Sequence, residues 1–195
     1  MEGHPQRKRI RLEAQSYAMG ACSVTIGIHE RSAAFQDHAL AGIAVRAIGD
    51  AAVDAGVVVH AYCVMPDHVH VLLEVREGVN PSPTNPDEAF PAHHGGGVSS
   101  RPLVEAQPPM IAFIRLLKGR TIAGARRQHL VHHSFWQRSF YDYFLRHGET
   151  IEVVTRYILN NPVRGQLVAR WDQWPWSGSL VLSHEDLVAV MDGRG

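Results

Sequence analysis

Two segments of the sequence carry side chains whose types and spacing suit metal-assisted chemistry. In the first, His68 and His70 are one residue apart and directly follow Asp67. Because side chains alternate between the faces of a β-strand, a strand here would project both imidazoles from one face, while Val69 and Val71 enter the other. Neutral imidazole is the commonest metal ligand in proteins. The pair is therefore a candidate site for a divalent cation that keeps open positions for a phosphate.

This pattern alone is weak, because the chain has 13 histidines and two histidines on a sheet face are also compatible with a structural or solvent-exposed role. Two neighbours bear on the choice. Asp67 precedes the pair, and His60 lies in the apolar run before it. They are either partners that orient the metal ligands or polar residues near a turn.

The second segment is RYILNNPV, which contains Tyr157 and Asn161. These residues are four apart, so in a helix they share one face about one turn from each other. Ile151, Val154 and Ile158 follow the spacing of a core-facing stripe, which places Tyr157 and Asn161 just beside it. The segment also fits an ordinary amphipathic helix with a half-buried tyrosine and Asn-Asn-Pro as its C-terminal stop.

The elements that must position these residues follow from hydrophobic periodicity and from breakers. We expect strands at 21–28, 57–64 and 68–75, a hairpin at 65–67, helices at 37–54 and 110–128, a short strand within 133–144, and a helix at 149–161 that Pro162 stops. This order favours an α+β fold, with a ferredoxin-like antiparallel sheet and helices packed on one of its faces.

Composition predicts one domain at 21–176, because 195 residues suffice for one well-buried core. We expect a basic N-terminal segment at 1–20, a low-complexity insertion at about 77–109 and a C-terminal tail at 177–195. No apolar run is long enough to cross a membrane, so the protein is expected to be cytoplasmic, with no membrane partner. Cys22 and Cys63 lie in apolar runs and are expected to be buried free thiols.

Charge is unevenly distributed although the formal net charge is zero. Residues 101–170 contain 11 Lys and Arg against 4 Asp and Glu, which gives 11 − 4 = +7. Such an excess could form a phosphate-binding face, or it could be a solvated helix surface.

Several segments together resemble the HUH single-tyrosine transposases. AYCVMPDHVHVLLE is similar to their metal-binding hairpin, and FWQRSFYDYFLR, YILNNPV and WPWSGS resemble the second half of the REP-associated tyrosine transposase branch. The N-terminal RKRIRLE and ACSVTIGI resemble its opening. The resemblance runs from about residue 7 to residue 179, interrupted by the low-complexity segment. It departs from the family pattern at Arg164, where a lysine is usual, and at Gly165, which arrives early.

The resemblance implies the HUH endonuclease fold and a DNA-cleaving enzyme. On this basis His68, His70 and Asn161 bind a divalent metal ion, Mg²⁺ or Mn²⁺, and Tyr157 is the nucleophile. The enzyme would cut and rejoin single-stranded or hairpin DNA through a 5′-phosphotyrosine intermediate, and it could act as a homodimer.

Three alternatives stay open. The chain could be a non-catalytic nucleic-acid-binding regulator on the same scaffold. It could be a metal hydrolase in which water attacks and Tyr157 is structural. Tyr141 or Tyr143 could also be the nucleophile, although neither has the helical partner that Asn161 gives Tyr157.

Overall fold

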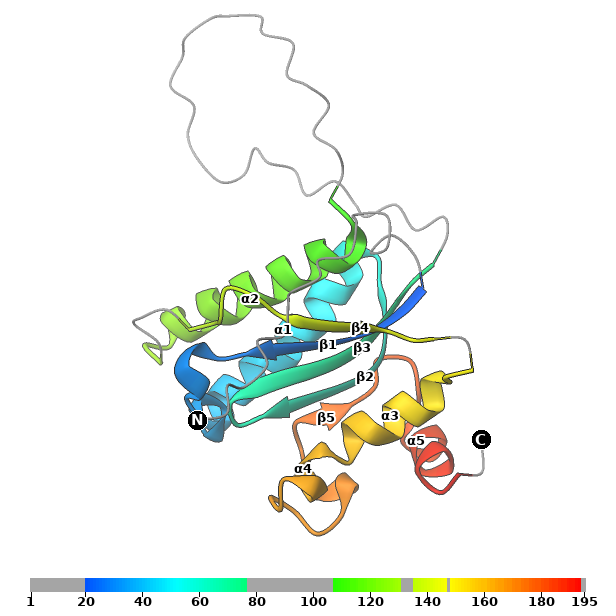
Figure 1. The fold of residues 1–195 in the computed structure, drawn as a ribbon. Coiled ribbons are helices and arrows are strands. Elements are labelled where there is room, and N and C mark those ends of the chain that lie inside the picture. Colours follow the sequence, from blue (N-terminus) through cyan, green and yellow to red (C-terminus); the bar gives the residue numbers. More distant parts are fainter. Residues whose placement is uncertain (1–19, 77–106, 131–134, 147, 194–195) are drawn as a thin grey trace, which may run out of the picture.

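The computed structural model describes residues 20–76, 107–130, 135–146 and 148–193. Within them five strands form one antiparallel sheet in the order β4-β1-β3-β2-β5, with β3 at its centre (Figure 1). The strands are β1 (Gly20–Gly27), β2 (Val58–Met65), β3 (His68–Val75), β4 (Tyr141–Phe144) and β5 (Ser177–Gly178). The helices are α1 (His38–Ala55), α2 (Pro109–Arg127), α3 (Ile151–Leu159), α4 (Asn161–Arg164) and α5 (His184–Met191), with 3₁₀ turns η2 (His29–Arg31), η3 (Ala34–Gln36) and η5 (Trp171–Gln173). The predicted α+β class with an antiparallel sheet is confirmed.

Local sequence explains the elements around the histidine pair. Pro66 and Asp67 form the two-residue turn between β2 and β3, and the register pairs Met65 with His68. The Asp67 backbone carbonyl also accepts a hydrogen bond from the Ile28 amide at 2.9 Å, which ties the turn to the end of β1. The hairpin is therefore held both by its own ladder and by the neighbouring strand.

Helix α1 has defined signals at both ends. The Asp37 side chain accepts hydrogen bonds from the amides of Ala39 and Leu40, as an N-cap does. Gly56 ends the helix at φ 64°, a left-handed conformation that glycine adopts without steric cost. These signals fix the helix within one residue of the expected 37–54.

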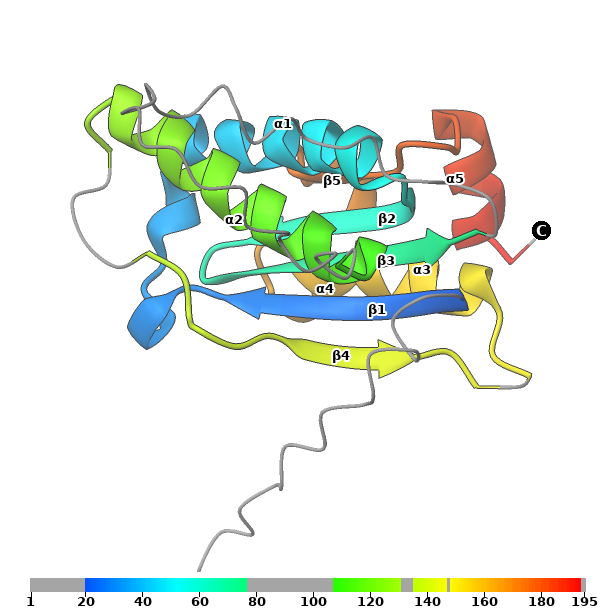
Figure 2. The same cartoon turned by 90° about the horizontal axis from the view of Figure 1, so that it is seen from above.

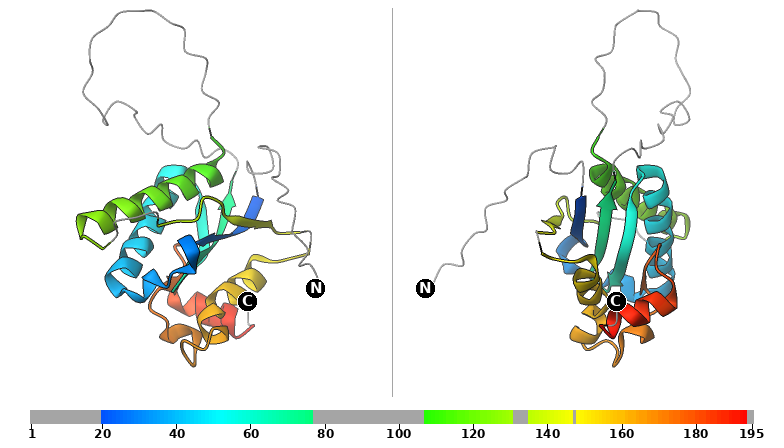
Figure 3. Two further views of the ribbon diagram at one scale, coloured as in Figure 1. Left: turned by 60° about the vertical axis from the view of Figure 1, so that its left-hand side comes forward. Right: turned by 90° about the vertical axis from the view of Figure 1, so that its right-hand side faces the viewer.

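Helices cover both faces of the sheet, so the expectation that they pack on one face is wrong. Helices α1 and α2 lie side by side on one face (Figure 2) and cover Val69, Val71 and Leu73 of β3. Helix α3 lies on the opposite side (Figure 3), where its Ile158 packs with Leu72 in a smaller cluster. Periodicity gave each helix an apolar face but could not say which face of the sheet would receive it. The face that carries the histidines is thus partly covered by the helix that carries Tyr157.

The end of α3 differs from the expectation that Pro162 stops a helix at 149–161. Helix α3 ends at Leu159, and the chain then starts the short helix α4, in which Pro162 occupies the first turn. Proline is tolerated there because the amide that it lacks would have no helical partner anyway. Asn161 therefore belongs to α4.

The segment expected to be a tail contributes two elements. Residues 177–178 form β5 on the edge of β2, and α5 begins with a capping box between Ser183 and Asp186. The basic segment at 1–20 lies almost wholly outside the described residues, as does 77–106 of the expected insertion, and α2 already begins at Pro109.

Both cysteines are buried free thiols, as the sequence predicts. Burial raises the pKa of Cys22 and of Cys63 to about 12. Neither thiol is therefore a nucleophile at neutral pH. Within the described residues, no helix has the length and apolar character needed to cross a bilayer.

Candidate metal and nucleophile site

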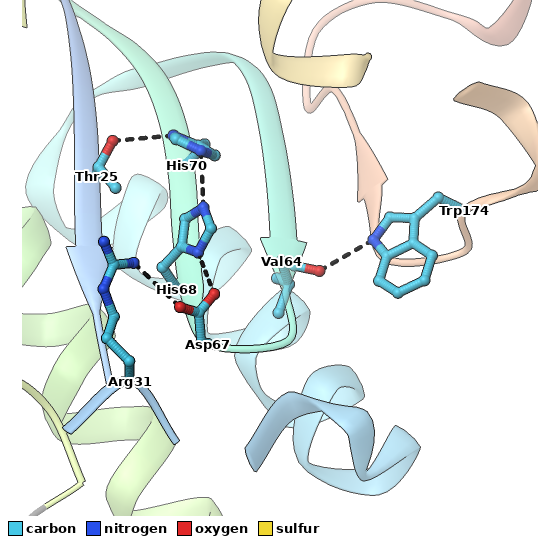
Figure 4. A network of polar contacts seen from close by, with 7 residues as sticks. All are labelled: Thr25, Arg31, Val64, Asp67, His68, His70 and Trp174. Atoms are coloured by element: carbon cyan, nitrogen blue, oxygen red, sulfur yellow. Dashed lines mark hydrogen bonds and ion pairs between the residues drawn. The ribbon is translucent and has the colours of Figure 1, made fainter. Parts of the chain in front are cut away.

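Strand β3 projects His68 and His70 from the same face, as its two-residue period predicts. Their Nε2 atoms lie 2.9 Å apart, and the rings meet edge to face (Figure 4). The intervening Val69 is fully buried on the opposite face. The prediction that a central strand presents both imidazoles on one face is confirmed.

Each imidazole is held by its other ring nitrogen. His68 Nδ1 lies 2.5 Å from Asp67 Oδ1, and Arg31 donates to the second oxygen of that carboxylate at 3.1 Å. His70 Nδ1 lies 2.9 Å from the hydroxyl of Thr25 (Figure 4). A carboxylate accepts the Nδ1 proton of His68, which leaves its Nε2 lone pair available to a metal. Asp67 is thus an orienting partner, which was one of its two expected roles.

Burial and nearby charges favour the protonation states that a metal site needs at His70 and Asp67. Burial, together with the nearby charges of His68 and Arg164, lowers the pKa of His70 to about 3. Partial burial would raise the pKa of Asp67, but its hydrogen bond and charge interaction with His68 and the charge of Arg31 lower it below its usual value. At neutral pH His70 is therefore a neutral imidazole beside an ionised carboxylate, the state in which imidazole binds metals.

His60 does not take part in this group. It lies at the bulge of β2, where the register with β3 shifts, and its Nε2 is 2.9 Å from Glu74 Oε2 near the far end of the hairpin. Of the two roles considered for His60, that of a partner to the metal ligands is wrong. A β-bulge is a local irregularity of pairing that alternation in the sequence does not reveal.

The donor set fits a divalent cation that takes oxygen ligands as well. Two nitrogen ligands about 2.1 Å from one ion, at right angles to each other, are about 3 Å apart, which matches the 2.9 Å between the two Nε2 atoms. Among the described residues no group of three or more His, Cys, Asp or Glu side chains is placed to hold one metal ion. Side-chain amides, water or a phosphate would have to complete the coordination, which suits Mg²⁺ or Mn²⁺ better than an ion that needs four protein ligands.

Tyr157 lies on α3, on the side of the sheet that carries the histidines, and its side chain is half exposed. The guanidinium carbon of Arg164 stands 4.5 Å from the centre of its ring, within the range of a cation–π contact. The same arginine is one of the charges that lower the pKa of His70. Arg164 therefore lies near both candidate groups.

Asn161 turns back on its own chain. Its Nδ2 donates to the carbonyls of Tyr157 at 2.9 Å and Ile158 at 3.2 Å, which leaves its Oδ1 outside these bonds. In the described residues no hydrogen bond joins Asn161 or Tyr157 to His68 or His70. The structure thus brings the two histidines together directly and places the other two residues on the adjacent helices.

The rival tyrosines have different surroundings. Tyr143 donates its hydroxyl to the carboxylate of Glu149 at 2.7 and 2.8 Å, and this hydrogen bond raises its pKa. Tyr141 is 59% exposed and stands opposite Thr25, which itself stands opposite His70. Directly opposed residues share a sheet face. Tyr141 therefore lies on the face of the histidines, which its place in the sequence did not indicate.

Thr25 and Arg31 were also not predicted. Thr25 could have been found, because it is a polar residue at a position of β1 that alternates with buried apolar ones. Arg31 could not, since it has positive φ in a 3₁₀ turn and meets Asp67 only through the fold. The two residues are 36 positions apart in the sequence, and nothing local signals their contact.

Basic residues gather around α2, away from the histidines. A cavity of about 380 Å³ between α1 and α2 is lined partly by Arg46, Arg120 and Arg127. A second cavity of about 390 Å³, on the other side of α2, is lined partly by Lys118, Arg126 and Arg138. Part of the excess of Lys and Arg in residues 101–170 is therefore concentrated on α2.

No protein-family model matches the sequence, and no curated protein matches it. The fold is similar to that of a REP-associated tyrosine transposase bound to a REP hairpin, with a TM-score of 0.53 and 17% identity over 89% of this chain and 82% of the other. A candidate transposase from Deinococcus radiodurans gives a TM-score of 0.42 and 17% identity over 83% of this chain and 92% of the other. The first similarity shows that this chain, with its five-stranded antiparallel sheet, shares the α+β fold of that tyrosine transposase.

Proposed function

We propose that this protein is a metal-assisted endonuclease and strand transferase that cleaves and rejoins single-stranded or hairpin DNA. The observation that carries the proposal is the pair of imidazoles on one strand face, with their Nε2 atoms 2.9 Å apart and their Nδ1 atoms held by Asp67 and Thr25. The similarity in fold to a tyrosine transposase supports the reaction class. Tyr157 is the proposed nucleophile, and His68, His70 and Asn161 are the proposed ligands of Mg²⁺ or Mn²⁺.

The proposed reaction balances without an external energy source. The phenolic oxygen of Tyr157 attacks the scissile phosphorus, the bond from phosphorus to the 3′-oxygen breaks, the leaving oxygen takes up a proton, and the phenolic proton passes to solvent. When bound, the cation supplies polarisation of a non-bridging phosphate oxygen. A 3′-hydroxyl can then attack the phosphotyrosine, which restores Tyr157 and joins a strand.

The surroundings of Tyr157 suit a nucleophile that must meet a polymer. Half of its side chain is exposed, so an extended strand can reach the hydroxyl. Arg164 lies over the ring, near enough to His70 to pair with a phosphate that enters between helix and sheet. The cavities around α2 offer further positive charge for the duplex stem of a hairpin, the kind of DNA that the similar transposase binds.

End-labelled DNA hairpins from the flanks of the gene test this proposal. With Mn²⁺ present, a hairpin labelled at its 3′-end should leave its label on the protein after denaturation, while one labelled at its 5′-end should release a fragment with a 3′-hydroxyl. A chelator should abolish both products. Binding without any cleavage would favour a non-catalytic regulator, and cleavage without an adduct would favour a hydrolase that uses water.

A further inference from the structure

A glycine on β1 leaves space beside the histidine pair. Gly27 stands directly opposite His68 in the β1–β3 ladder. Because opposed residues of antiparallel strands share a face, a Cβ on Gly27 would point to the side on which His68 projects. Because Gly27 has no side chain, strand β1 leaves room for another residue's side chain next to the proposed metal ligands.

The side chain of Gln137 fills that space. Its Oε1, Cδ and Nε2 atoms lie 2.8, 2.9 and 3.1 Å from the position that a Cβ on Gly27 would take. The carboxamide therefore rests over the backbone of Gly27, on the same sheet face as His68. Any residue larger than glycine at position 27 would displace it.

The fold holds Gln137 there through its backbone. Its amide donates to the Gly27 carbonyl at 2.9 Å, and its own carbonyl accepts from Lys118 Nζ at 2.7 Å. The preceding Trp136 is buried and pairs with Ile28 at the end of β1. The side-chain amide, in contrast, has no hydrogen bond within the described residues. Gln137 is only partly buried, and with no partner among the described residues its amide is available to a ligand.

We propose that Gln137 provides, through Oε1, an oxygen ligand to the divalent cation of His68 and His70. This inference rests on the proposed function. The two imidazoles supply only nitrogen, whereas Mg²⁺ and Mn²⁺ favour oxygen ligands. Gln137 would add its oxygen from the β1 side, and Asn161 would add its own from the side of α3 and α4. Both amides are neutral, so the ion keeps its full charge for a phosphate.

Titration of the full chain with Mn²⁺, followed by calorimetry and by the spin resonance of free Mn²⁺, tests this assignment without DNA. Gln137→Ala should weaken Mn²⁺ binding by about tenfold or more. Gln137→Glu should strengthen it, because a carboxylate is a better ligand than an amide for these ions. Gly27→Ala should weaken it too, since the new Cβ occupies the place of the Gln137 amide.

Gln128→Ala is the matched control, because Gln128 is an exposed glutamine at the end of α2 and should leave the affinity unchanged. Thermal midpoints of all variants establish that they fold. An unchanged affinity in Gln137→Ala, or an equal loss in Gln137→Glu, would overturn the assignment of Gln137 while His70-dependent Mn²⁺ binding upheld the metal site. Absence of Mn²⁺ binding by the natural protein would overturn both.

Discussion

The two imidazoles share one strand face, but they are held by unlike groups. The Nδ1 of His68 is held by a carboxylate that is itself bound by Arg31, whereas the Nδ1 of His70 is held by the hydroxyl of Thr25. Burial and the nearby charges of His68 and Arg164 lower the pKa of His70 to about 3. His70 is therefore neutral at physiological pH, as a metal ligand must be. Removal of its side chain should reduce DNA cleavage more than DNA affinity.

His70→Ala should reduce cleavage of a labelled hairpin to background. Affinity for the same hairpin should change by no more than about twofold, because binding depends mainly on phosphate contacts with basic residues. Exposed His29 provides the control, since His29→Ala removes an imidazole outside the pair. Cleavage by His70→Ala at the natural rate in the presence of chelator would remove the metal from the mechanism.

Glu74 offers a pH-dependent test that does not involve the proposed metal site. Partial burial would raise its pKa, but hydrogen bonds from His60 and Arg76 lower it below the usual 4.5. The folded state therefore binds this proton less readily than the unfolded state. The stabilisation is fully present above the unfolded pKa and is lost as the pH falls through the folded one.

Glu74→Gln should lower the free energy of unfolding by about 1–3 kcal/mol near neutral pH. Urea denaturation in the presence of chelator should show this difference at about pH 6, and the difference should shrink as the pH falls through the folded pKa of Glu74. A difference that stayed constant over this range would mean that the ionised form of Glu74 contributes nothing.

At the level of the elements, the sequence predicts what depends on neighbouring residues. The β2–β3 hairpin, the common face of His68 and His70, and the extent of α1 follow from alternation, turn residues and caps. Prediction from the sequence fails where segments that are distant in the chain come into contact. The placement of α3 on the second face depends on Leu72 and Ile158, which are far apart in the chain, and Gln137 reaches Gly27 across 110 residues. Such contacts leave no local periodicity.

Helix α2 carries positive charge toward cavities on both of its sides. At 3.6 residues per turn, Lys118 and Arg126 point to one side of the helix. Arg120 and Arg127 point to another side, and the mean directions of the two pairs differ by about 150° around the helix axis. An α-helix with its side chains is about 10–12 Å wide, close to the ~12 Å width of the DNA major groove. Phosphates on either side of the helix could therefore meet basic residues.

The double variant Arg126→Gln with Arg127→Gln removes one charge from each cavity and should weaken hairpin binding. The slope of log K against log salt should become shallower by about 0.9 for each lost phosphate contact, measured by fluorescence anisotropy. Arg115→Gln is the control, because this exposed arginine of α2 lines neither cavity. An equal loss in the control would show that only overall charge matters.

In the molecule as a whole, the sheet separates two layers with different characters. Helices α1 and α2 form one layer, which carries the basic cavities (Figure 2). Helix α3 belongs to the other layer, on the sheet face that carries the histidines, and it lies across the sheet from α1 and α2 (Figure 3). The segment 135–144 connects the layers, because Gln137 and Arg138 line a basic cavity and Tyr141 lies on the histidine face. Under the proposed function, a hairpin stem bound at α2 would reach the histidines by a single strand that passes β4.

Replacement of residues 77–106 by a short Gly-Ser bridge should leave the thermal midpoint nearly unchanged. The Pro, Gly, Ser and His composition of this segment offers little apolar surface to a core. Differential scanning calorimetry of the two proteins measures the effect. A large drop in the midpoint or loss of a cooperative transition would show that the segment packs against the domain.

In the proposed mechanism the phenolic oxygen of Tyr157 becomes bonded to DNA. Tyr157→Phe keeps the ring and its contact with Arg164, at a stability cost of about 1 kcal/mol or less for a lost hydroxyl hydrogen bond. Tyr141→Phe is the matched variant, since Tyr141 is an exposed tyrosine on the same sheet face as the histidines.

The decisive measurement is the denaturation-resistant adduct with 3′-labelled hairpin DNA in these two variants, together with mass spectrometry of the modified peptide from the natural protein. The proposed mechanism predicts that Tyr157→Phe forms no adduct and cuts no DNA while it still binds the hairpin. It also predicts that Tyr141→Phe still forms the adduct and that the phosphodeoxynucleotide is on Tyr157. Cleavage by Tyr157→Phe, or an adduct mapped to Tyr141 or Tyr143, would contradict it.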